Sequence, residues 1–99
     1  MIDLDVEVAV LGAGFGGSLT AIMLERIGLK PALIERGVHP RFALGESSTP
    51  LADFVLTQLA ERYDLPRIKP LANYGSWQAS YPELPCGLKR GFSYFQHVA

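Results

Sequence analysis

Three groups of residues in this 99-residue sequence have types and spacings that could do chemistry. The first is a glycine-rich run at residues 12–17, with Glu35 roughly twenty positions further on. The second is the run GESSTP at residues 45–50, and the third is Lys89 within the run CGLKRGF. These runs offer backbone donors, a carboxylate, hydroxyls and an amine.

The glycine-rich run matches G-x-G-x-x-G through Gly12, Gly14 and Gly17. In a dinucleotide site the first glycine permits a sharp turn, the second lets the backbone approach a pyrophosphate, and the third allows close helix packing. The helix that follows would add unpaired N–H groups and a partial positive charge. The run therefore predicts a binding site for the phosphates of a dinucleotide, to which the intervening residues also contribute: Ala13, Phe15 and Gly16.

Glu35 strengthens this prediction because it follows a second predicted strand at the spacing of an acid that accepts ribose hydroxyls. A carboxylate at this position also disfavours a 2′-phosphate and therefore NADP. Arg36 and Arg41 could reach the phosphates, although a surface position explains both equally well. The alternative is a glycine-rich turn that binds no ligand.

The elements that would position these residues can be read from the apolar pattern. Residues 6–11 are rich in β-branched side chains and predict a buried parallel strand, and residues 31–35 predict a second one. Between them, apolar residues recur at helical spacing until Gly28, which is a plausible helix end. This order predicts a βαβ unit with parallel strands.

The rest of the chain is less regular. Residues 37–45 predict a loop, and Ser48, Thr49 and Pro50 predict the start of a helix over about residues 50–63. Residues 66–86 contain four prolines and predict irregular structure with aromatic anchors, whereas residues 91–96 predict a strand.

Composition narrows the function classes. The chain contains nine Lys and Arg residues and ten Asp and Glu residues. The resulting net charge of -1 gives no reason to expect nucleic acid or an anionic membrane as a partner. The apolar run at residues 6–11 is too short to span a membrane. The single cysteine, Cys86, cannot form an internal disulfide, which favours a cytoplasmic location. His39 and His97 are isolated, so we expect no metal site.

The extended run GAGFGGSLTAIMLERIG resembles the N-terminal signature of the FAD-binding fold of glutathione reductase. This resemblance implies FAD rather than NAD as the cofactor, bound by residues 12–17, Glu35 and Arg36. A covered parallel sheet needs more than two or three strands. We therefore expect an incomplete Rossmann-like α/β fold, in which residues 1–99 are the N-terminal part of an FAD-binding domain.

The GESSTP run supports a narrower resemblance. Its hydroxyls and helix start could lie near an anion or the flavin edge, although a capped helix start explains them as well. Together with the first motif it resembles the flavin-dependent halogenase family, which pairs G-x-G-x-x-G with a G-E-S/A-T-x-P box, and the run CGLKRGF is also similar to sequences of that family. The resemblance covers essentially the whole chain and implies four further cofactor-binding residues: Gly45, Glu46, Ser47 and Ser48.

The resemblance also implies an activity. In that family oxygen and reduced FAD convert halide to hypohalous acid, a lysine directs halogenation of an aromatic substrate, and a separate flavin reductase supplies the reduced FAD. Lys89 is the lysine implied here, and a solvated lysine beside Arg90 is the alternative. A flavin monooxygenase, a geranylgeranyl-reductase-like enzyme and a non-catalytic dinucleotide-binding fragment remain as alternative functions.

Overall fold

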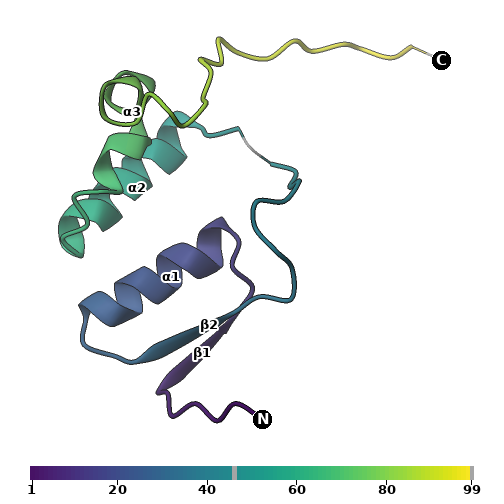
Figure 1. Cartoon of the computed structure of the whole chain (residues 1–99). Helices are drawn as coiled ribbons and strands as arrows, with labels where there is room; N and C mark the ends of the chain where they lie inside the picture. Colours follow the sequence, from purple (N-terminus) through teal and green to yellow (C-terminus); the bar gives the residue numbers. More distant parts are fainter. Residues whose placement is uncertain (46, 99) are drawn as a thin grey trace.

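The structure is a computed structural model that describes residues 1–45 and 47–98. Figure 1 shows two groups of elements, which we call the βαβ lobe and the helical lobe. The βαβ lobe comprises β1 (Val8–Leu11), α1 (Phe15–Arg26) and β2 (Pro31–Ile34). The helical lobe comprises α2 (Pro50–Arg62), the 3-10 helix η1 (Lys69–Ala72) and α3 (Tyr74–Ser80).

The βαβ lobe confirms the predicted order of strand, helix and strand. β1 and β2 pair in parallel, from Val8 opposite Pro31 to Leu11 opposite Ile34. α1 packs against both strands, as Figure 1 shows. Gly28 follows the helix with φ of 89°, a left-handed conformation that glycine adopts without strain. The lobe is thus the βαβ unit of a Rossmann-like α/β fold.

The predicted helix near residues 50–63 is also confirmed, as α2. The Thr49 side chain accepts a hydrogen bond of 3.3 Å from the backbone N–H of Ala52, and Pro50 occupies the first helical position. α2 packs against η1, and the buried apolar side chains of the described residues all lie in or beside these two elements: Leu56, Ala60, Leu65 and Ala72.

The prediction of irregular structure over residues 66–86 is wrong, because this segment contains η1 and α3. The Asn73 side chain caps α3 by accepting a hydrogen bond of 3.1 Å from the backbone N–H of Ser76. The four prolines lie outside α3, so they do not interrupt it. Two aromatic side chains do anchor the segment: Trp77 donates to the Leu84 carbonyl at 3.0 Å, and Tyr81 donates to the Arg67 carbonyl at 2.7 Å.

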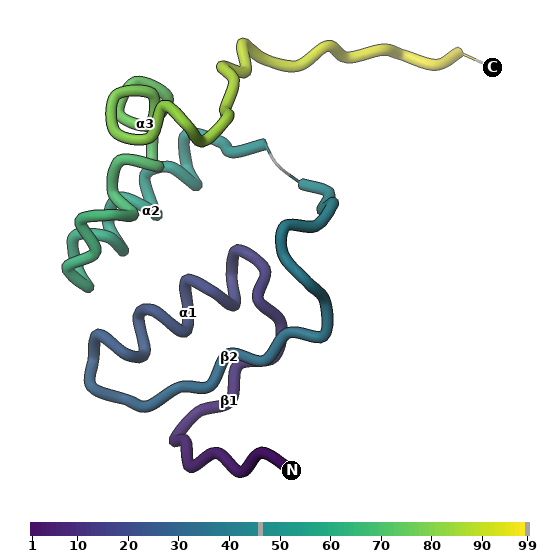
Figure 2. Tube along the Cα trace, in the orientation of Figure 1, coloured from purple at the N-terminus to yellow at the C-terminus, as the bar shows by residue number. Residues whose placement is uncertain are grey.

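The prediction of a strand at residues 91–96 is also wrong, since residues 87–98 form neither helix nor strand. Figure 2 shows this segment running away from both lobes. A strand is stabilised by pairing with a neighbour, and no described strand lies beside this one. Its aromatic side chains are therefore exposed.

Among residues 1–45 and 47–98, no helix combines the length and the hydropathy that crossing a bilayer requires.

Candidate functional site

The turn after β1 depends on glycine at two positions for different reasons. Gly12 has φ of 100°, and its N–H donates a 2.7 Å hydrogen bond to the carbonyl of Ile34 at the end of β2. At Gly17, a Cβ atom would lie 1.9 Å from the carbonyl oxygen of Gly12. Since real Cβ atoms do not approach a backbone oxygen this closely, only glycine lets α1 start so near the strand.

The N-terminal end of α1 is arranged to receive an anion. Gly14 is the N-cap residue, and no side chain accepts a hydrogen bond from the first turn there. The first turn also contains no acidic residue that would neutralise the partial positive charge of the helix. A Cβ at Gly14 or Gly16 would meet nothing within 4 Å, so the space before the helix is open. The backbone donors here can therefore bind phosphate oxygens.

Glu35 lies at the mouth of this turn. Its Oε2 accepts a 2.8 Å hydrogen bond from the backbone N–H of Ala13, and its Oε1 accepts one of 2.9 Å from that of Gly37. These two bonds, first that from Gly37, lower the pKa of the carboxyl, and the nearby Arg41 and His39 lower it further. The carboxylate is thus ionised at neutral pH and can accept hydroxyl hydrogens.

A hollow of about 440 Å³ lies beside the turn and between the lobes. It is lined mainly by apolar side chains of α1 and η1, with Arg41 and His39 from the intervening loop. His39 Nε2 is 3.8 Å from Glu35 Oε2. His39 was not among the predicted site residues, although it lies four residues after Glu35. Arg36 was among them, but it is exposed and does not line this hollow.

The second and third sequence motifs meet at another point. Lys89 Nζ donates a hydrogen bond of 3.4 Å to Ser47 Oγ and lies 3.9 Å from the centroid of the Phe92 ring. The neighbouring Ser48 hydroxyl donates to the Asp53 carboxylate in the first turn of α2. We call Ser47, Lys89 and Phe92 the lysine corner.

Two more residues of the GESSTP run, Gly45 and Glu46, were predicted to bind the cofactor. Gly45 has φ of 88° at the end of the loop that connects the lobes, a conformation that favours glycine. Glu46 lies outside the described residues, so its predicted contact with the cofactor has no structural counterpart here.

Comparison with known proteins shows which sequences and structures this chain resembles. No protein-family model matches the chain. The halogenase PrnC of Pseudomonas fluorescens, which acts on monodechloroaminopyrrolnitrin, is 32% identical over 91 residues, covering 92% of this chain and 16% of PrnC. Tetracycline 7-halogenase of Kitasatospora aureofaciens is 30% identical over 95 residues, covering 96% of this chain and 17% of the relative.

A solved halogenase structure is also similar to this chain. The crystal structure of the halogenase PltM in complex with phloroglucinol and FAD superposes with a TM-score of 0.72 at 33% identity, covering 76% of this chain and 15% of PltM. By sequence and by fold, this chain is a relative of the flavin-dependent halogenases. It spans less than a fifth of the length of these halogenases.

In this halogenase relative, the glycine turn and the lysine corner belong to different parts of the structure. The turn is in the βαβ lobe, whereas Ser47 lies directly before α2 and Lys89 follows the helical lobe. Residues 35–45 lead out of the βαβ lobe and residues 47–49 lead into α2, as the tube in Figure 2 shows. The distance between turn and lysine corner therefore depends on how the lobes are held together.

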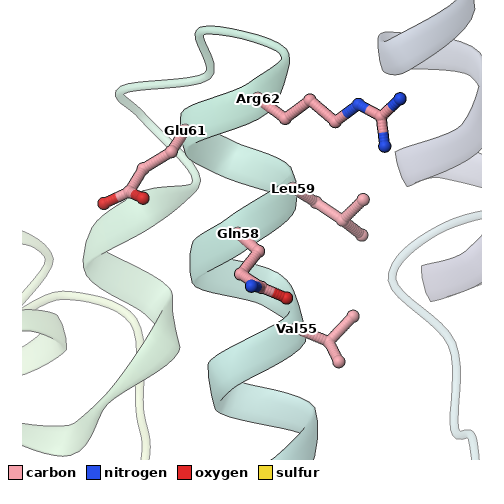
Figure 3. A pocket seen from close by; sticks show the side chains of 5 residues that line it. All are labelled: Val55, Gln58, Leu59, Glu61 and Arg62. Carbon is pink, nitrogen blue, oxygen red and sulfur yellow. The ribbon is translucent and has the colours of Figure 1, made fainter.

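A second hollow, of about 540 Å³, lies along α2 and is lined by five side chains: Val55, Gln58, Leu59, Glu61 and Arg62. Figure 3 shows Val55, Leu59 and Arg62 pointing from α2 toward the neighbouring α1, while Glu61 points to the other side. None of the predicted site residues lines this hollow. All five lining residues belong to α2, so we assign no chemistry to this hollow.

Proposed function

We propose that this protein supplies the cofactor-binding part of an FAD-dependent halogenase that acts on an aromatic substrate with oxygen and halide. The observation that carries the proposal is the Glu35 carboxylate at 2.8 Å from the Ala13 N–H, at the mouth of a turn that only glycine can form. The relation to halogenases supports the reaction type. Bound FAD, once reduced, would supply the electrons that activate oxygen.

The residues of the turn fit the ADP half of FAD. A close strand-to-helix approach at Gly17, open space at Gly14 and an uncapped helix start are suited to a pyrophosphate. The ionised Glu35 would accept a ribose hydroxyl, and it would disfavour a phosphate on the same ribose. Arg41, which lines the adjacent hollow, would partly neutralise the pyrophosphate.

At the lysine corner, we propose that the Lys89 side chain holds the electrophilic halogen species, either as a hydrogen-bond-donating ammonium or, after loss of a proton, through the nitrogen lone pair. The Ser47 hydroxyl accepts a hydrogen bond from the ammonium, and the Phe92 ring stabilises the cation through its π face. Ser47 also belongs to the GESSTP run, so the corner links the amine to the segment proposed to contact the flavin. Both features orient Lys89, whose long side chain is otherwise flexible.

Further proposals concern the complete protein. The related halogenases are several times longer than this chain, which supports residues 1–99 being the first part of a larger FAD-binding domain. A separate flavin reductase as electron donor follows from the halogenase proposal. A cytoplasmic location stays a prediction from the single cysteine.

The test is an assay of the complete protein with FAD, a flavin reductase, NADH, chloride or bromide, and a panel of phenols, pyrroles and indoles. Mass spectrometry of the products is expected to show a halogen isotope pattern that depends on the added halide. Hydroxylated products alone would make the protein a monooxygenase. Bound FAD with no product would make it a binding module, and a failure to bind FAD would contradict the proposal at its base.

A further inference from the structure

The contact between the end of α1 and the end of α2 joins the two lobes. Arg26, in the last turn of α1, donates hydrogen bonds from Nε, at 3.1 Å, and from Nη2 to the backbone carbonyl oxygen of Asp64. Nη2 also lies 3.4 Å from the Asp64 carboxylate. A planar guanidinium that engages one residue through two nitrogens fixes direction as well as distance.

The end of α2 explains why this carbonyl is available. Asp64 has φ of 52°, and the following backbone N–H groups turn back, from Asp64 to Glu61 at 3.4 Å and from Leu65 to Ala60 at 2.8 Å. This pattern is a Schellman motif, which reverses the chain and terminates the helix. The Asp64 carbonyl is then directed toward α1, at the negative end of the α2 dipole, where a guanidinium is stabilised.

The rest of the boundary between the lobes is loosely packed. α1 packs on β1 and β2, and α2 packs on η1, but the described helices of one lobe do not pack closely on those of the other. A hollow of about 440 Å³ lies between α1 and η1. The α2 side chains that point toward α1 in Figure 3 line a second hollow. Among the described residues, the hydrogen bonds between Arg26 and Asp64 are therefore a direct contact that joins the end of α1 to the end of α2.

We propose that Arg26 is a positioning residue that holds the lysine corner at a fixed distance from the glycine turn. This inference rests on the proposed function, because it assigns the two ends of one cofactor-dependent site to the two lobes. Arg26 touches neither the turn nor Lys89. It acts through the helical lobe, by restricting the rotation of α2 relative to α1.

The first experiment measures the distance between the lobes in the complete protein. Spin labels on non-natural amino acids at the exposed positions Thr20 and Ala79 report on α1 and α3 without involving native cysteines. We expect one narrow distance distribution that broadens in Arg26→Ala and narrows again in Arg26→Lys, whose amine can still donate to the carbonyl. Glu25→Ala removes a neighbouring exposed side chain and is expected to leave the distribution unchanged.

A variant of Asp64 tests whether its backbone carbonyl or its carboxylate makes the contact that matters. In Asp64→Gly the carbonyl remains and glycine adopts the positive φ without strain, so we expect the narrow distribution to persist. A distribution as broad as that of Arg26→Ala would contradict a contact made mainly through the carbonyl. An unchanged distribution in Arg26→Ala would overturn the proposal altogether.

The activity measurement separates positioning from general stability. In Arg26→Ala we expect the same melting temperature and FAD affinity as in the wild type, but product formation lower by about tenfold or more, restored in part by Arg26→Lys. If Arg26→Ala lost FAD affinity and turnover to the same extent, or if its turnover were unchanged, a positioning role would be refuted. The distance measurement needs no halogenation, so an inactive wild-type protein would refute the proposed function without affecting the test of the lobe contact.

Discussion

The Glu35 carboxylate lies 2.8 Å from the backbone nitrogen of Ala13, although 22 positions separate the two residues in the chain. The parallel register explains this contact. Leu11 pairs with Ile34, so the residues that follow each strand emerge at the same edge of the sheet. An acid at the end of β2 must therefore face the turn at the end of β1. In this geometry the carboxylate and the helix start face the same space.

Replacing Glu35 by glutamine should change both cofactor binding and the pH dependence of stability. The folded protein lowers the pKa of Glu35, so ionised Glu35 stabilises the fold at pH values above its usual pKa. This contribution is lost as the pH falls through the lowered pKa of the folded state. We expect urea unfolding of Glu35→Gln to vary less steeply with pH in the acidic range, and FAD titrations to show weaker binding at neutral pH.

Glu83→Gln is the matched control, because Glu83 is an exposed carboxylate outside the site. It should bind FAD as the wild type does. Wild-type FAD affinity in Glu35→Gln would instead show that Glu35 holds the turn through Ala13 but does not contact the cofactor.

Two neighbouring glycines in α1 should respond oppositely to alanine. Gly17→Ala places a Cβ 1.9 Å from the Gly12 carbonyl oxygen, and separating strand from helix should cost roughly 1–3 kcal/mol of unfolding free energy. Gly16→Ala meets nothing within 4 Å and should stabilise the helix by about 0.5–1 kcal/mol. Urea unfolding followed by circular dichroism would measure both. Equal stability of the two variants would contradict the close approach at Gly17.

The βαβ lobe could be predicted from the sequence because its determinants are local. The glycine spacing, the apolar recurrence and the position of Glu35 each act within one turn, one helix or one strand pair. The start of α2 was predictable for the same reason, since Thr49 and Pro50 are cap residues whose effect spans a single helical turn.

Contacts between distant residues could not be predicted in this way. Lys89 and Ser47 are 42 positions apart, and Arg26 and Asp64 are 38 apart, with no periodic pattern to connect either pair. The contact between Lys89 and Ser47 depends on how the helical lobe folds between them. The contact between Arg26 and Asp64 depends on how that lobe lies against α1. α3 was missed for a different reason: the prolines around it suggested irregular structure, whereas Asn73 provides a local cap that starts a short helix between them.

Asn73 therefore offers a test of the structure that needs no cofactor. Asn73→Ala removes the acceptor for the Ser76 N–H and should destabilise the protein by about 1 kcal/mol. Asn73→Asp retains an acceptor oxygen and should retain most of the stability, with helix content measured by circular dichroism. If alanine and aspartate behaved alike, the side chain would not be the cap.

Lys89 is the residue whose substitution tests the proposed chemistry most directly. Lys89→Ala should retain FAD binding, because the turn that binds the ADP half is in the other lobe, and should lose halogenation by about 10²-fold or more. Product formation by mass spectrometry and an FAD titration on the same preparation would measure both effects. Arg90→Ala is the control, since it removes the adjacent exposed cation and leaves Lys89 in place.

Lys89→Arg distinguishes two ways in which Lys89 could act. Arginine retains the positive charge and can still donate to Ser47, but its guanidinium does not deprotonate in proteins and so offers no nucleophilic amine. If the amine itself binds the halogen, Lys89→Arg should be as inactive as Lys89→Ala. Restored halogenation in the arginine variant would show that a cation beside Ser47 suffices, and unchanged halogenation in the alanine variant would remove Lys89 from the reaction.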